Sequence, residues 1–216
     1  MILKMKLDEI KSSHHVAICG MNGSGKTYLA KVYLAGKNFP NVIVYDTKGT
    51  FTWEQVPDAP IFQRLSDLMK FQGGRAIYRP SIEEFEDKAI IEAFFKWVYL
   101  RGNTIVYIDE LASFTTSTYA PLYLKAIWTR GRELNVGCWA STQRPKNVPL
   151  LAFSEASFFF IFALNLEADR RRIYEVVQSK KIIDIVPKDY HFWFYNINMK
   201  EPVMAILKWK KVKRVW

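Results

Sequence analysis

The sequence predicts an α/β fold with a mostly parallel central sheet that is flanked by helices and ends in antiparallel strands at its C-terminal edge. As far as Leu166, short apolar runs alternate with segments of helical periodicity, which is typical of parallel strands covered on both faces. Beyond Leu166, a charged helical segment precedes two strand-like runs. The 216 residues suit a single domain over residues 1–216, with a core at about 14–166 and a basic extension of the sheet at about 167–216.

The individual elements follow in order along the chain. Apolar, β-branched or aromatic runs predict strands at residues 15–19, 42–45, 76–78, 104–108, 137–141, 158–164, 192–196 and 203–209. Helical spacing predicts helices at residues 26–34, 83–100, 120–134 and 167–177. The longest of these, 83–100, is supported by apolar side chains at helical intervals: Phe85, Ala89, Ile90, Ala93, Phe94 and Trp97.

Composition and charge narrow the class of protein. Half of the residues are hydrophobic, which excludes a disordered chain, and the only cysteines, Cys19 and Cys138, lie in apolar runs and indicate reduced core thiols. The longest strongly apolar run, residues 156–164, is too short to cross a membrane, so we expect no direct membrane insertion.

The formal net charge is +10, and residues 161–216 hold twelve Lys or Arg against six Asp or Glu, a local excess of +6. A charge of this sign attracts polyanions. The final residues, 208–216, are the densest basic segment. They are interpreted either as a contact with nucleic acid phosphates or as a solubilising tail or protected edge strand.

One segment matches the phosphate-binding pattern G-x-x-x-x-G-K-T/S throughout and lies between a predicted strand and a predicted helix. Its residues are Gly20, Met21, Asn22, Gly23, Ser24, Gly25, Lys26 and Thr27. Glycines in such a loop let backbone N–H groups surround phosphate oxygens, and the helix that follows presents the positive end of its dipole. Lys26 is expected to reach the β- and γ-phosphates of ATP, and Thr27 to place its hydroxyl on Mg²⁺.

Two consecutive carboxylates, Asp109 and Glu110, end the strand predicted at residues 104–108. In a doubly wound sheet, ligands bind beyond the carboxyl ends of the strands, so this pair is expected beside the phosphate loop. Asp109 is then a candidate Mg²⁺ ligand through water. Glu110 is a candidate general base for the attacking water.

Three further segments, read together with these two motifs, resemble the FtsK–HerA superfamily of DNA-pumping ATPases over residues 14–146. They are the strand and turn at 42–49, which ends in Asp-Thr-Lys-Gly, the helix end at 129–137 with its Arg-Gly-Arg, and the strand at 140–145, which ends in Gln-Arg-Pro. The resemblance implies a RecA-like (ASCE) P-loop NTPase fold. It also implies roles for four residues: Gln143 as a sensor of the γ-phosphate, Arg130 or Arg132 as an arginine finger in the neighbouring subunit, and Lys48 as a phosphate contact within or between subunits.

The resemblance further implies a ring of identical subunits, a pentamer or hexamer, that hydrolyses ATP to move double-stranded DNA. The size of this chain is most similar to that of viral genome-packaging ATPases, so a capsid or portal vertex protein is an expected partner. The host cytoplasm is the expected location, with transient presence at the virion packaging vertex. A plasmid-transfer or secretion-coupling ATPase, and a nucleotide-switched assembly factor that does not pump, are the alternatives. The loops at 114–118 and 146–147 are candidate contacts with DNA in a central pore.

Overall fold

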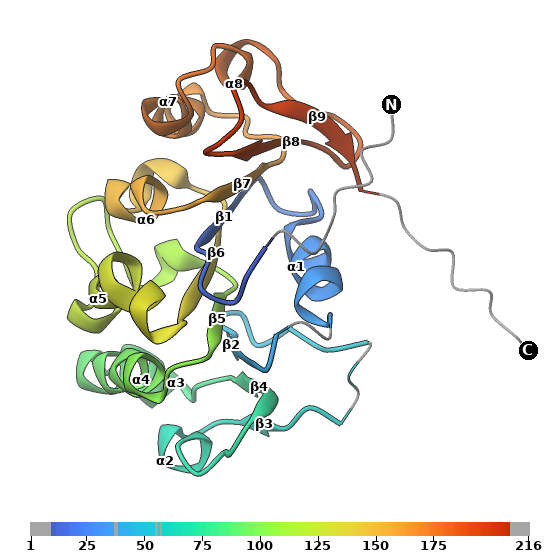
Figure 1. The fold of residues 1–216 in the computed structure, drawn as a ribbon. Coiled ribbons are helices and arrows are strands. Elements are labelled where there is room, and N and C mark those ends of the chain that lie inside the picture. The colour runs from blue at the N-terminus through green and yellow to red at the C-terminus, as the bar shows by residue number, and fades with distance from the viewer. Residues whose placement is uncertain (1–9, 37–38, 55, 57, 208–216) are drawn as a thin grey trace, which may run out of the picture.

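The computed structural model describes residues 10–36, 39–54, 56 and 58–207. Within these residues, nine strands form one sheet in the order β3-β4-β2-β5-β6-β1-β7-β8-β9 (Figure 1). The strands are β1 Val16–Cys19, β2 Asn41–Tyr45, β3 Ile61–Phe62, β4 Gly74–Tyr78, β5 Ile105–Ile108, β6 Gly137–Thr142, β7 Phe158–Ile161, β8 His191–Asn196 and β9 Val203–Ile206. Strands β1 to β7 pair in parallel, and β8 and β9 continue the sheet antiparallel.

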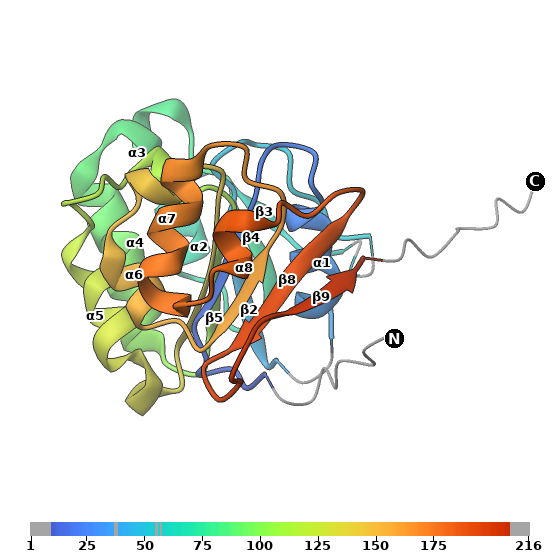
Figure 2. The same cartoon turned by 90° about the horizontal axis from the view of Figure 1, so that it is seen from above.

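Helices cover the two faces of the sheet unequally. The α-helices are α1 Lys26–Leu34, α2 Leu65–Leu68, α3 Ile82–Glu86, α4 Lys88–Arg101, α5 Leu122–Arg130, α6 Leu150–Ser154, α7 Glu167–Val177 and α8 Lys181–Asp184, and the 3-10 helices are η2 Leu111–Ser113, η3 Gly131–Leu134 and η4 Pro145–Asn147. Helices α4, α5, α6 and α7 lie in a row on one face, and α1 lies on the other (Figures 1 and 2). A separate hydrophobic core fills each face. The central strands are apolar on both sides because both sides are buried.

The strand order determines what lies beside β1. Its neighbours are β6 and β7, which are distant in sequence, and β5 lies one strand farther away, beyond β6. Parallel strands present their carboxyl ends at one edge of the sheet. The loop after β1, the tip of β6 and the acidic end of β5 therefore lie in a row at that edge.

Several predicted elements differ in their bounds. The helix expected at residues 83–100 is two helices, because Asp87 adopts an extended backbone and its carboxylate caps α4 by accepting the N–H groups of Ala89 and Ile90. The helix expected at 120–134 ends at Arg130 and continues as η3. At Gly131 a side-chain carbon would lie 2.8 Å from the Val136 carbonyl oxygen, so this tight turn needs glycine.

Other predictions are confirmed. The helices at 26–34 and 167–177 form as predicted, and β8 and β9 are antiparallel strands at one end of the sheet, with β9 as the edge strand. Cys19 and Cys138 are buried, unpaired thiols. No helix in the described part of the chain is long and apolar enough to cross a membrane. The basic segment at 208–216 lies outside the described residues.

Candidate active site

The phosphate loop joins β1 to α1 and is anchored to the strand on each side. The Gly20 N–H donates to the Thr142 carbonyl at 3.1 Å, and the Met21 N–H donates to the Ala163 carbonyl at 2.8 Å. Gly23 and Gly25 have φ angles of 73° and 105°, a region that favours glycine. The loop is thus held in a fixed conformation at the N-terminus of α1, as an anion-binding loop requires.

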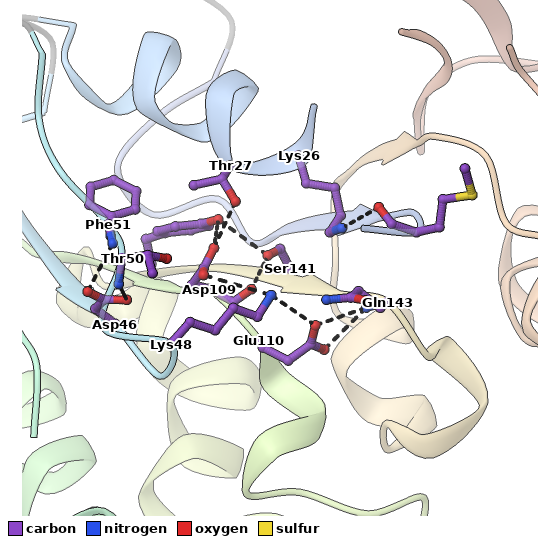
Figure 3. A network of polar contacts seen from close by, with 12 residues as sticks. Lys26, Thr27, Asp46, Lys48, Thr50, Phe51, Asp109, Glu110, Ser141 and Gln143 are labelled. Atoms are coloured by element: carbon purple, nitrogen blue, oxygen red, sulfur yellow. Dashed lines mark hydrogen bonds and ion pairs between the residues drawn. The ribbon is translucent and has the colours of Figure 1, made fainter. Parts of the chain in front are cut away.

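Lys26 is buried at the base of this loop. Its Nζ donates to the Met21 carbonyl at 2.9 Å, and the residue is 5% exposed (Figure 3). Burial, followed by the nearby charge of Lys48, lowers the pKa of Lys26 to about 8. An ammonium that has lost most of its water and faces a second cation favours a polyanionic ligand such as a triphosphate.

The structure brings Thr27 and Asp109 together as the sequence predicts. Thr27 Oγ1 donates to Asp109 Oδ1 at 3.0 Å, and the buried Tyr107 hydroxyl donates to the same oxygen at 3.0 Å (Figure 3). Among the described residues, no cluster of three or more His, Cys, Asp or Glu could hold a metal ion without other ligands. One hydroxyl and one carboxylate fit Mg²⁺, which in nucleotide sites takes few protein ligands and completes its shell with phosphates and water.

Glu110 lies at the centre of a second group of contacts. Its carboxylate accepts the backbone N–H of Gln143 at 3.2 and 3.3 Å, and Lys48 Nζ lies 3.5 Å from Glu110 Oε2 and 4.0 Å from Asp109 Oδ2 (Figure 3). The main chain of Gln143 makes this contact with Glu110, whereas the sensor role expected from the sequence belongs to the Gln143 side chain. Three residues from three different strand ends therefore converge beside the phosphate loop.

Asp46, which is not among the site residues expected from the sequence, holds the turn that positions Lys48. The fully buried carboxylate of Asp46 accepts the N–H groups of Thr50 at 3.2 Å and Phe51 at 3.0 Å, and it pairs with Arg79 Nε at 2.9 Å. These bonds close the turn that presents Lys48 to the acidic pair. The Asp-x-Lys-Gly pattern contained this signal, since an Asp that opens a turn commonly binds the backbone that follows it.

The segment after Gln143 is tied to α7. Buried Asp169 accepts Arg144 Nε at 3.1 Å and the Lys146 N–H at 2.9 Å. Residues 143–146 therefore join the strand tip that contacts Glu110 to the surface helix α7. The Lys146 side chain itself is exposed.

Arg130 and Arg132 lie at the opposite end of the sheet from the phosphate loop of their own chain. They precede the start of β6, whereas Gln143 follows its end, and six residues of strand separate these points by roughly 17–20 Å. Arg132 Nη2 donates to the Glu155 carbonyl at 2.9 Å and to Ser157 Oγ at 3.1 Å. In the described part of the chain, the exposed side chain of Arg130 makes no hydrogen bond or ion pair.

Comparisons with known proteins bear on the fold and on the class of protein. No protein-family model matches the chain. The DNA packaging ATPase P9 of Enterobacteria phage PRD1 is 26% identical over 199 residues, which are 88% of this chain and 85% of that protein. The genome packaging NTPase B204 of Sulfolobus turreted icosahedral virus 2, solved with AMPPCP, superposes with a TM-score of 0.75 at 20% identity over 91% of this chain and all of that chain.

A more distant neighbour is the pCW3 conjugation coupling protein TcpA, with a TM-score of 0.54 at 16% identity over 89% of this chain and 59% of that chain. The similarity in sequence to P9 and the similarity in fold to B204 and TcpA bear out the predicted resemblance and the predicted fold class. The predicted resemblance to the FtsK–HerA superfamily is thus confirmed, and the chain is an ATPase whose fold is similar to that of P-loop packaging ATPases.

Proposed function

We propose that this chain is the subunit of a ring motor that hydrolyses ATP to translocate double-stranded DNA, and that its task is to package a viral genome into a preformed capsid. The observation that carries the proposal is the convergence of Lys26, Thr27, Asp109, Glu110 and Gln143 at one edge of the sheet. The sequence similarity to a phage DNA packaging ATPase over most of both chains supports the assignment to packaging.

The chemistry follows from this arrangement. The loop and Lys26 bind the triphosphate. Thr27 and Asp109 would hold Mg²⁺, which would supply positive charge to the phosphates. Glu110, held by the Gln143 N–H, takes a proton from the attacking water. Lys48 lies near enough to balance the charge of both carboxylates. Any movement of Gln143 on loss of the γ-phosphate would reach the exposed Lys146 through the Asp169 contacts.

Ring formation is supported by the position of Arg130. A side chain at the amino end of the strands cannot reach the phosphate loop of its own subunit. In a head-to-tail ring, however, that surface can face the carboxyl end of the next subunit. There a guanidinium would stabilise the charge that develops on the transferred phosphoryl group. We assign this role to Arg130 ahead of Arg132, because Arg132 is already hydrogen-bonded within its own chain.

Binding to DNA is supported by charge and by the position of two loops. The net charge of +10 favours contact with phosphates irrespective of sequence. The loop at 114–118 follows the acidic end of β5, and exposed Lys146 follows the tip of β6. Both loops therefore lie at the edge of the sheet where nucleotide is bound, which suits contacts that change during hydrolysis.

The decisive experiment measures ATP hydrolysis with and without double-stranded DNA. A motor is expected to hydrolyse ATP several-fold faster when DNA is added. The variant Lys146→Ala, which removes an exposed lysine, is expected to show less of this stimulation and an unchanged rate without DNA. Hydrolysis that ignores DNA would refute the motor and favour the nucleotide-switched assembly factor. Copurification with a capsid or portal vertex protein would support packaging, whereas copurification with a membrane-anchored transfer or secretion complex would support the coupling-protein alternative. Within packaging, we expect the protein in the host cytoplasm and transiently at the virion vertex.

A further inference from the structure

An apolar groove lies along α4, toward the end of this helix that precedes β5. It has a volume of about 470 Å³, and its lining comes from the end of α2 and from α4: Met69, Ala93, Lys96, Trp97, Leu100 and Arg101. Leu100 is 65% exposed, and Met69 is exposed as well. Exposed apolar side chains that surround a hollow are typical of a surface that another protein covers.

The floor of this groove is held in place from within the chain. The Arg101 guanidinium lies over the Trp97 ring, 5.0 Å from its centroid. Arg101 Nη1 donates to the Phe71 carbonyl at 2.7 Å, and Nη2 donates to the Gln72 carbonyl. These contacts join α4 to the segment that follows α2. The groove is therefore formed before a partner binds, which lowers the entropic cost of binding.

The groove has a positive rim. Its lining includes the cations Lys96, which is exposed, and Arg101, and no carboxylate of the described residues lines it. An apolar floor with basic edges favours a partner that presents an apolar side chain beside acidic ones.

The chain itself carries a surface of this kind on α3. Ile82 is 80% exposed, the largest exposed fraction among the large apolar side chains of the described residues. Four of residues 83–87 are acidic. Ser81 caps α3 by accepting the Glu84 N–H at 3.3 Å, and the Glu84 carboxylate accepts the Leu65 N–H at 2.8 Å. A fixed backbone thus presents an exposed isoleucine among carboxylates.

Helix α3 and the groove lie toward opposite ends of the sheet. Helix α3 follows the carboxyl end of β4, whereas Leu100 and Arg101 end α4 shortly before β5 begins. Helix α4 has 14 residues, a length of about 21 Å, and starts directly after α3. Ile82 is therefore better placed to enter the groove of another copy than the groove of its own chain.

We propose that α3 of one subunit docks in the α4 groove of the next, with Ile82 against Trp97 and Leu100 and with the acidic residues of α3 beside Lys96. Ile82 is the anchor of this contact, and the charges at the rim orient the two surfaces. The partner is a second copy of this chain, bound head to tail. The inference rests on the proposed function, because it assumes a ring.

The same arrangement suits the arginine finger. Helix α5, which ends at Arg130, packs beside α4 (Figure 1), so Arg130 and the groove are about one helix spacing, 8–10 Å, apart. On the facing surface, α3 follows β4 and Glu110 follows β5, and only β2 lies between these strands, so two strand spacings of about 5 Å separate them. One head-to-tail contact can therefore bring α3 to the groove and Arg130 to the edge that holds Glu110.

The first test follows assembly of the full chain by analytical ultracentrifugation, with double-stranded DNA, Mg²⁺ and AMPPCP. Ile82→Asp and Leu100→Asp each place a charge in the apolar contact and should weaken association by at least about thirtyfold. Both side chains are exposed, so each variant should fold and bind AMPPCP like the unmodified protein. The matched control is Ile197→Asp, an exposed apolar position between β8 and β9 at the other edge of the sheet, which should assemble normally.

Mixing the two impaired variants shows which surfaces meet. Ile82→Asp keeps an intact groove, and Leu100→Asp keeps an intact α3. The mixture should therefore form dimers but no rings, because the free surfaces of each dimer are the two impaired ones.

Pairing of cysteines tests the contact directly. The native Cys19 and Cys138 are buried, so new exposed cysteines supply the reactive thiols. Ile82→Cys mixed with Leu100→Cys should give a disulfide-linked dimer under mild oxidation, because only neighbouring residues can form the bond. Ile197→Cys mixed with Leu100→Cys should give none.

The outcomes separate the interface from the ring. If the unmodified chain assembled and both Asp variants assembled equally well, this interface would be overturned while the ring would stand. Loss of assembly in both variants without dimers or a disulfide in the mixtures would also overturn it, because Ile82 and Leu100 would then not meet. If the unmodified chain stayed monomeric with DNA and AMPPCP, the proposed ring would fail, and the interface with it.

Discussion

Replacing Glu110 by Gln isolates the role of its carboxylate as a base. Glutamine has nearly the same shape and keeps an oxygen that can accept the Gln143 N–H, so the strand tip should not move. The ion pair with Lys48 is lost, but Lys48 stays partly exposed and its Nζ still lies 4.0 Å from Asp109 Oδ2, so its charge keeps a partner. The melting temperature should therefore change little. ATP affinity should be kept or slightly increased, because a negative charge near the phosphates is removed.

The hydrolysis step should slow by a factor of about 10² to 10⁴, the usual contribution of a general base, which corresponds to about 2.7–5.5 kcal/mol on the barrier. Single-turnover hydrolysis and equilibrium binding, measured at saturating Mg²⁺, separate this effect from a loss of binding. Glu86→Gln, an exposed carboxylate in α3, is the matched control and should behave like the unmodified protein. If Glu110→Gln hydrolysed ATP at the unmodified rate, Glu110 would not be the base and the assignment of this site would be wrong.

Three further predictions concern charge, assembly and DNA. Burial lowers the pKa of Lys26 to about 8, so ATP affinity should fall as the pH rises above about 8, where Lys26 loses the proton that the phosphates favour. Lys26→Arg should remove this pH dependence. An identical pH profile of ATP affinity in both proteins would contradict the prediction. Arg130→Ala should bind ATP but turn over slowly, and mixing it with Glu110→Gln should restore partial activity where Glu110 of one subunit meets Arg130 of the next. No recovery in proteins shown to co-assemble would favour Arg132 as the finger. Deleting residues 208–216 should weaken DNA binding and flatten its salt dependence, and an unchanged salt slope would identify the segment as a solubilising tail or edge strand.

The phosphate loop and the acidic pair could be identified from the sequence because each is local. The glycines, Lys26 and Thr27 lie within eight consecutive residues, and the flanking apolar run and helical spacing predict the strand–loop–helix context. Asp109 and Glu110 follow directly on an apolar strand. Since the carboxyl ends of parallel strands meet at one edge, their proximity to Thr27 followed from the fold class.

Tertiary structure decided how these parts are connected. Periodicity indicates which face of a strand is buried but not which strand lies beside it. Only the strand order shows that β6 lies between β1 and β5 and brings the Gln143 main chain to Glu110. The same holds for Asp46 and Arg79, which are 33 residues apart and together fix the turn that presents Lys48.

The two arginines and the backbone at residues 189–190 make the same point. The resemblance favours Arg130 over Arg132 as the finger, and the packing of the chain supports that order, because it engages Arg132 with Glu155 and Ser157 and leaves Arg130 exposed. Asp189 and Tyr190 adopt a left-handed backbone although neither is glycine, which local propensity disfavours. A hydrogen bond from the distant Leu207 N–H to the Tyr190 carbonyl helps to hold this conformation, so neighbouring residues alone could not have predicted it.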